Sequence, residues 1–120
     1  MTSAPQGVPG SAVGAGPRWG LARVRGTSMG PGLRPGDRLW VSYRRPPRPG
    51  DVVVARFPDG TIVVKRAAER RTTVSGRPGW WLLSDDPRAG VDSRHRGPIG
   101  EGDVLGVVRA RLWPHPRRVT

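Results

Sequence analysis

The sequence contains no cysteine and only two histidines among its 120 residues. Without cysteine, the chain can form neither a disulfide framework nor a thiolate metal site. The two histidines, His95 and His115, lie 20 positions apart. Two isolated imidazoles at that spacing are more typical of a protein surface than of a metal centre. We therefore expect neither a metal ion nor another cofactor.

Long apolar runs are also missing. No stretch approaches the ~20 apolar residues that a membrane-spanning helix requires. Residues 1–20 lack a charged start followed by an apolar segment, which is the pattern of a secretory signal. We expect no membrane span, and a soluble chain that stays in the cytoplasm.

The positive charge comes from arginine and almost not at all from lysine. The net charge is +12, and 20 of the 21 basic residues are Arg, scattered without a dense block. Such a charge attracts polyanions. The chain has only one Tyr and one Phe, however, and no dense block of Lys or Arg. A non-catalytic basic β-module that binds nucleic acid is therefore an alternative function, and nucleic acid is an unlikely main partner.

Glycine and proline are abundant, with 18 and 14 residues, and both oppose long helices. Short apolar runs alternate instead with turn signals. The clearest signal is Pro58-Asp59-Gly60, which predicts a hairpin between strands at 51–57 and 61–66. Further strands are expected at 21–25, 38–43, 72–75, 80–83 and 103–113. We predict an all-β, compact, partly closed barrel-like domain of six or seven strands with no convincing helix.

The predicted domain spans residues 18–113, which is room for one modest core. Residues 1–17 are mostly Gly, Pro, Ala and Ser. They offer too little apolar surface to offset the entropy lost on ordering, so we predict a disordered tail. Residues 114–120 are rich in Pro and Arg, and we predict a flexible C-terminal tail there.

Ser28 lies in a Gly- and Pro-rich turn between two predicted strands. A serine on such a turn projects its hydroxyl outward and leaves nearby backbone N–H groups free to receive an oxyanion. Serine is also a common turn former, so its position alone does not indicate a nucleophile.

Lys65 is the only lysine in the chain. Arginine keeps its proton in proteins, whereas lysine can lose its proton when it is desolvated. Lys65 ends an apolar run, and strand alternation places it on the same face as Val63. A neutral amine there can take the proton of a serine hydroxyl. The alternative is a surface lysine at a strand end that holds its charge in solvent.

Three segments, taken together and in order, resemble the conserved boxes of type I signal peptidases. They are Ser28-Met29-Gly30-Pro31-Gly32-Leu33 with Gly36-Asp37, then Lys65-Arg66, then the stretch from Ser84 to Arg94 with its Asp92-Ser93-Arg94 ending. The resemblance extends from about residue 23 to residue 108. It implies a mostly β fold and a serine endopeptidase with Ser28 as nucleophile and Lys65 as general base. LexA-type peptidases belong to the same superfamily.

The resemblance also implies what surrounds the nucleophile. Thr27 and Ser28 would form the loop whose amides hold the oxyanion. Met29 and Leu33 are candidates for lining the substrate groove, with core packing as the alternative role.

Four charged residues are expected to support the site. The resemblance implies a structural ion pair between Asp92 and Arg94. Asp37 and Asp85 are expected to be structural turn or pairing residues.

The sequence departs from the resembled family near the lysine. Gly90 occupies the position at which some signal peptidases place a serine that orients the lysine amine. Orientation of Lys65 would then fall to a backbone carbonyl or to water. Ser84 stands where the family usually has glycine, and Gly32 where it usually has threonine. Gly26 offers the oxyanion hole no side-chain hydroxyl.

A short, Arg-rich member without a membrane anchor is most like the nickel-type superoxide dismutase maturation proteases. Membership would imply removal of an N-terminal leader from the dismutase precursor, which would be the protein partner. Another soluble serine–lysine peptidase is the second alternative. It would be either a signal-peptidase relative with a different client or a self-cleaving protein like the LexA repressors. The nucleic-acid-binding module is the third alternative.

Overall fold

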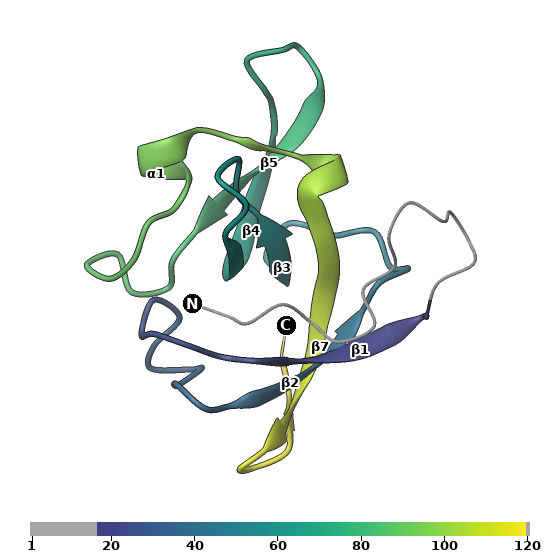
Figure 1. Ribbon diagram of the computed structural model, residues 1–120, viewed down its shortest axis with the longest axis vertical. Coiled ribbons are helices and arrows are strands. Elements are labelled where there is room, and N and C mark those ends of the chain that lie inside the picture. The colour runs from purple at the N-terminus through teal and green to yellow at the C-terminus, as the bar shows by residue number, and fades with distance from the viewer. Residues whose placement is uncertain (1–16, 120) are drawn as a thin grey trace.

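The computed structural model describes residues 17–119, which form an all-β domain. One eight-stranded sheet has the strand order β1-β2-β7-β3-β4-β5-β6, with β8 paired to β7. The strands are β1 (Trp19–Arg23), β2 (Arg38–Ser42), β3 (Val52–Arg56), β4 (Ile62–Thr72), β5 (Pro78–Leu83), β6 (Ile99–Gly100), β7 (Val104–Trp113) and β8 (Arg117–Arg118). The sheet curls into a half-barrel (Figure 1). The all-β, partly closed prediction is therefore confirmed.

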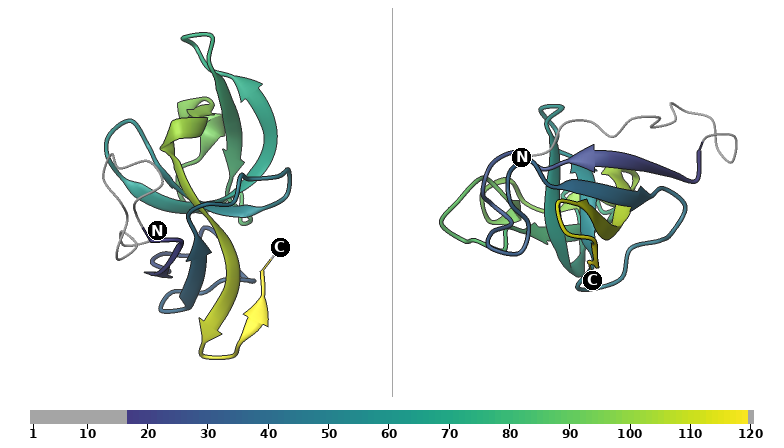
Figure 2. Two further views of the ribbon diagram at one scale, coloured as in Figure 1. Left: turned by 90° about the vertical axis from the view of Figure 1, so that its right-hand side faces the viewer. Right: turned by 90° about the horizontal axis from the view of Figure 1, so that it is seen from below.

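Strand β7 connects two halves of the curled sheet. Its N-terminal part pairs with β3, and the remainder pairs with β2, both antiparallel. In the left view of Figure 2 this strand runs from the upper half of the molecule to its lower end, with β1 and β2 toward the lower end and β4 and β5 toward the upper end. Ser28 lies in the loop between β1 and β2 of the first group, and Lys65 lies in β4 of the second group.

The Pro58-Asp59-Gly60 turn joins β3 to β4 as predicted. Phe57 N–H donates to the Thr61 carbonyl at 2.9 Å, and Gly60 has a φ of +88°, a conformation that glycine adopts without strain. Strand β4 is longer than predicted, because it continues to Thr72. The separate strand predicted at 72–75 is wrong, since residues 73–77 form the turn between β4 and β5. The second half of β4 carries charged, exposed residues, so the pattern of apolar residues does not indicate that the strand continues there.

The core consists of two buried clusters that share the strands β3 and β4. The first core cluster contains Val52, Val54 and Val64 together with residues of β1, β2 and their connecting loop. The second core cluster contains Val53, Ala55 and Val63 together with Trp80 and Leu82 of β5. Successive side chains of a strand point to opposite faces. Strand β3 and the first half of β4 are therefore buried on both sides.

The tail predicted at 1–17 lies outside the described residues except for Pro17. At the other end the structure differs from the flexible tail predicted at 114–120, because β8 pairs with β7 and Val119 packs in the first core cluster.

The sequence predicts no helix, but a single turn, α1 (Ser93–Arg96), and a 3-10 turn, η1 (Glu101–Asp103), are present. No helix within residues 17–119 is long and apolar enough to span a bilayer.

Candidate active site

Tight backbone turns hold Ser28 in the loop between β1 and β2. Gly30 N–H donates to the Thr27 carbonyl at 2.9 Å, and Leu33 N–H donates to the Met29 carbonyl at 3.0 Å. Met29 and Leu33 are buried and belong to the first core cluster. Of the two roles left open for these side chains, the structure shows core packing, which anchors the loop under Ser28.

The Ser28 carbonyl is hydrogen-bonded, whereas the Ser28 N–H has no partner within residues 17–119. Its carbonyl accepts the Asp86 N–H at 2.8 Å, which joins the loop to the segment after β5. Within the described chain, no hydrogen bond from the Ser28 N–H is present. A free amide beside the nucleophile is suited to receiving an oxyanion. Thr27 lies beside it with an exposed side chain.

Lys65 lies in β4, where Val53 of β3 is its cross-strand partner. Its side chain is only 3 % exposed, so it is not a surface lysine at a strand end. Burial lowers the pKa of the Lys65 amine below the usual lysine value. The Asp92 carboxylate opposes that shift and the Arg94 guanidinium adds to it. The environment therefore favours the neutral amine more than solvent would.

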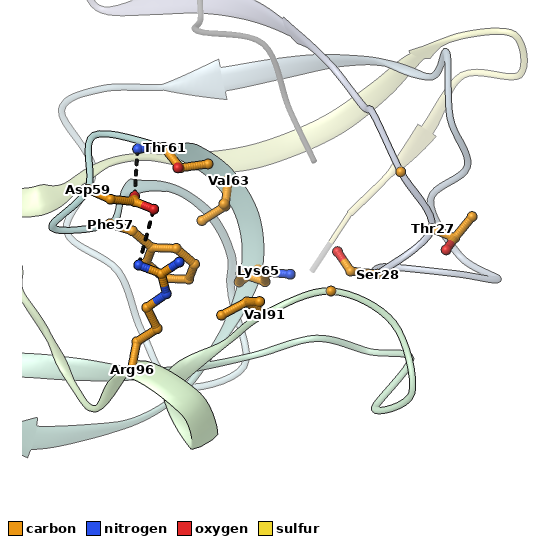
Figure 3. A pocket seen from close by; sticks show the side chains of 11 residues that line it. Thr27, Ser28, Phe57, Asp59, Thr61, Val63, Lys65, Val91 and Arg96 are labelled. Atoms are coloured by element: carbon orange, nitrogen blue, oxygen red, sulfur yellow. Dashed lines mark hydrogen bonds and ion pairs between the residues drawn. The ribbon is translucent and has the colours of Figure 1, made fainter.

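The Ser28 hydroxyl and the Lys65 amine face the same gap beside Gly90 (Figure 3). A Cβ atom placed on Gly90 would lie 3.6 Å from Ser28 Oγ and 3.1 Å from Lys65 Nζ. Among the described residues no hydrogen bond joins the two groups directly. The amine donates instead to Ser84 Oγ at 2.9 Å. Contacts between a nucleophile and its base are often longer before substrate binds.

Asp92 organises the segment that follows β5. The carboxylate is fully buried and accepts hydrogen bonds from Ser84 N–H at 2.9 Å and from Arg94 N–H and Nη2 at 3.0 Å each. Burial would raise the Asp92 pKa, but the hydrogen bonds from Arg94 and Ser84 outweigh it and hold the pKa at about 2. Asp92 also caps α1 in a capping box with His95. The Asp92–Arg94 pair thus holds this segment together.

The remaining two predicted acidic residues lie outside the gap and make structural contacts. Asp37 accepts the Arg34 N–H at 2.9 Å and lies 3.5 Å from Arg111 Nη1. Asp85 binds Arg66 through both carboxylate oxygens, at 2.8 and 2.7 Å. Asp37 closes the turn before β2, and Asp85 fastens the chain after β5 to β4.

A pocket of about 510 Å³ opens beside the two reactive groups, and we call it the Ser28 pocket. Its lining residues are Gly26, Thr27, Ser28, Phe57, Asp59, Thr61, Val63, Lys65, Gly90, Val91 and Arg96. Apolar side chains separate Lys65 from the far end, where Arg96 and Asp59 form an ion pair at 3.1 Å (Figure 3). The Arg96 guanidinium also lies over the Phe57 ring, 5.5 Å from its centre.

Most residues that line the Ser28 pocket were not predicted from the sequence. Phe57, Val91 and Arg96 come from three separate segments, and no short motif contains them. The only available signal was the Asp59 turn, which indicated a hairpin but not a pocket. Among residues 17–119, no group of three or more His, Cys, Asp or Glu residues is arranged to hold a metal ion.

Comparison with known proteins gives a family match. The family model described as Peptidase S24-like matches residues 8–109. The chain is 30 % identical over 112 residues to the mitochondrial inner membrane protease subunit 1 of Schizosaccharomyces pombe, covering 76 % of this chain and 71 % of that protein. It is 39 % identical over 93 residues to the LexA repressor of Pseudomonas aeruginosa, and 35 % identical over 97 residues to that of Photorhabdus laumondii.

The match to the LexA repressors covers 74 % and 78 % of this chain. It covers only 42 % and 45 % of the repressors themselves, so the chain spans less than half of their length.

Proposed function

Because this chain belongs to the Peptidase S24-like family, we propose that it is a serine endopeptidase with Ser28 as nucleophile and Lys65 as general base. One observation carries the proposal. The only lysine of the chain is buried and shares a gap with the hydroxyl of a turn serine. Burial without a carboxylate in direct contact is what a lysine needs to lose its proton near neutral pH.

The reaction proposed for this dyad is acyl transfer. The neutral Lys65 amine takes the Ser28 proton while Oγ forms a bond to the scissile carbonyl carbon. The carbonyl oxygen becomes an oxyanion, which the free Ser28 N–H stabilises. Collapse of this intermediate breaks the C–N bond, and the Lys65 ammonium returns the proton to the leaving amine. A water molecule, deprotonated by Lys65, then hydrolyses the ester and restores Ser28.

The proposed substrate is a precursor protein with an N-terminal leader. An extended segment crossing the Ser28 pocket would place one side chain against the apolar wall of Phe57, Val63 and Val91. We propose the precursor of a nickel superoxide dismutase as the client. The support for that client is the sequence resemblance of a short, Arg-rich chain to the maturation proteases of that enzyme.

Cleavage of the dismutase precursor by the purified protein, followed by mass spectrometry, tests the proposal. We expect release of the leader by the unaltered chain, and a loss of at least ~10³-fold in Ser28→Ala and Lys65→Arg. Arginine keeps the charge of Lys65 but cannot act as a base. The matched control is Arg70→Lys, an exchange of the same pair of residue types at an exposed position of β4. Full activity of Lys65→Arg would refute the dyad.

The similarity to LexA repressors favours a second candidate, a peptidase that cuts its own chain. Incubating the protein alone at alkaline pH distinguishes the two. Fragments that form at a rate independent of protein concentration, and that disappear in Ser28→Ala, would indicate self-cleavage. An intact chain that cuts the precursor in trans would indicate processing of a separate client.

A further inference from the structure

We infer that Ser84 orients the Lys65 amine toward Ser28; this inference rests on the function proposed above. Lys65 Nζ donates a hydrogen bond to Ser84 Oγ at 2.9 Å, and the two side chains are 3 % and 7 % exposed. The bond joins β4 to the residue that directly follows β5. Ser84 touches the base and not the substrate, so it is a positioning residue.

A neutral amine needs such an acceptor because it can rotate about its Cε–Nζ bond. The amine has two N–H donors and one lone pair, and only the lone pair can take the Ser28 proton. An acceptor that holds one N–H limits the rotation. The lone pair is then directed into the gap that Ser28 Oγ shares with Lys65 Nζ. Fixing reacting groups before reaction is worth a large part of the catalytic effect.

Position 90, where the resembled family places its orienting serine, cannot supply the hydroxyl in this chain. Gly90 has a φ of +75°, which side-chain-bearing residues rarely adopt. A Cβ atom there would lie 2.9 Å from Ser28 Cβ, closer than carbon atoms pack. The backbone and the surroundings of this loop therefore strongly disfavour a side chain at 90. The hydroxyl instead comes from position 84, at the opposite end of the same segment.

The Ser84 backbone is fixed from two sides. Its N–H donates to the buried Asp92 carboxylate at 2.9 Å. The next residue, Asp85, holds Arg66 through two hydrogen bonds, so neighbouring residues of β4 bind neighbouring residues after β5. An acceptor held this firmly can fix the direction of a flexible lysine side chain.

A nearby serine shows what a purely structural role looks like. Ser93 is also buried, at 1 % exposure, but its Oγ accepts the backbone N–H of Leu82 at 2.8 Å. Ser84 Oγ accepts only the Lys65 amine among the partners within residues 17–119. Ser93 therefore provides a matched control for the loss of a buried hydroxyl in the same segment.

Nuclear magnetic resonance of the Lys65 side chain tests the inference directly. Since Lys65 is the only lysine, a sample labelled with ¹³C,¹⁵N-lysine gives one side-chain signal, and its pH titration can be followed in each variant. A hydroxyl oxygen accepts more strongly from an ammonium than from an amine. We therefore expect Ser84→Ala to move the titration to lower pH, and Ser84→Thr to restore it. Ser93→Ala should lower the melting temperature without moving the titration.

Precursor cleavage gives the second readout. We expect Ser84→Ala to lower kcat about 100-fold with KM unchanged, because the amine is misplaced and the pocket is not. An unmoved Lys65 titration or an unchanged kcat in Ser84→Ala overturns the inference. If that variant does not fold, a missing nuclear Overhauser effect between Ser84 Hβ and Lys65 Hε in the unaltered protein overturns it. Failure of every form to cut any precursor refutes the peptidase proposal instead, and the titration still reports the contact.

Discussion

Ser28 and Lys65 are held by two different kinds of interaction. Ser28 rests on backbone turns, with the apolar side chains of Met29 and Leu33 packed beneath its loop. Lys65 projects from a strand paired on both sides, and its amine is held by a polar network in which Ser84 is fixed by Asp92. Apolar packing thus positions the proposed nucleophile, and buried hydrogen bonds position the proposed base.

The difference follows from the chemistry of the two groups. A serine hydroxyl is neutral in the resting enzyme and needs no desolvation to stay so, and a well-packed turn therefore suffices to present it. A lysine amine has to be desolvated to lose its proton and still needs an acceptor for its N–H groups. That combination is found only where a buried polar partner is itself fully bonded.

The largest effect is expected when the packing under the nucleophile is removed. Met29→Ala deletes most of a side chain that is 2 % exposed, which should cost roughly 2–5 kcal/mol of unfolding free energy. Urea unfolding measures this loss. Val74→Ala, at a fully exposed position, is the control and should change the free energy by less than about 0.5 kcal/mol. A small loss at Met29 would show that backbone turns alone hold the nucleophile.

The next largest effect is expected at Asp92, which fixes the backbone of Ser84 beside Lys65. The Asp92 pKa of about 2 lies below its usual value of 3.8. A lowered carboxylate pKa stabilises the fold above pH ~4, and that contribution is lost as pH falls toward 2. Asp92→Asn should therefore cost on the order of 2 kcal/mol near neutral pH, and the difference from the unaltered protein should vanish near pH 2.

Urea unfolding over that pH range measures the Asp92 effect. The control is Asp103→Asn, which changes an exposed carboxylate at the end of η1. If the Asp92→Asn protein were as stable as the unaltered protein at neutral pH, the hydrogen bonds of Asp92 would add no net stability to the segment that carries Ser84.

The smallest change in stability is expected at Gly90, which borders both the Ser28 hydroxyl and the Lys65 amine. Gly90→Ala and Gly76→Ala each place a side chain at positive φ, +75° and +84°, and this backbone conformation alone should cost about 1 kcal/mol in either case. Only the methyl group at 90 would meet other atoms, 2.9 Å from Ser28 Cβ. Precursor cleavage should therefore fall about 100-fold in Gly90→Ala and stay unchanged in Gly76→Ala. Equal activity of the two variants would place Ser28 farther from this loop.

The all-β fold could be predicted from the sequence. The sequence also placed Lys65 near Ser28, and the two groups do face one gap, but the amine is hydrogen-bonded to Ser84 and not to Ser28. Turn residues mark the hairpins locally, and a lone buried lysine is conspicuous in an arginine-rich chain. The role of Ser84 could not be predicted, because its contact with Lys65 depends on how β4 and β5 align. That alignment includes a shift between Ala67 and Glu69, which no local pattern indicates.

The remaining differences have similar causes. Met29 and Leu33 could be either core or groove residues, since an apolar side chain in a loop suits both. At the C-terminus, the many Pro and Arg residues led to the prediction of a flexible tail, although one apolar residue, Val119, packs in the first core cluster. Its position depends on the pairing of β8 with β7, which short exposed strands do not signal.

The burial of β3 and the first half of β4 on both faces has a consequence for how the molecule can respond to a bound peptide. A strand packed between two clusters cannot shift without disturbing both of them. We therefore expect Lys65, the proposed base, to stay fixed when a substrate binds. Any adjustment would fall to the Ser28 loop and residues 86–91, which the hydrogen bond from the Asp86 N–H to the Ser28 carbonyl joins to each other.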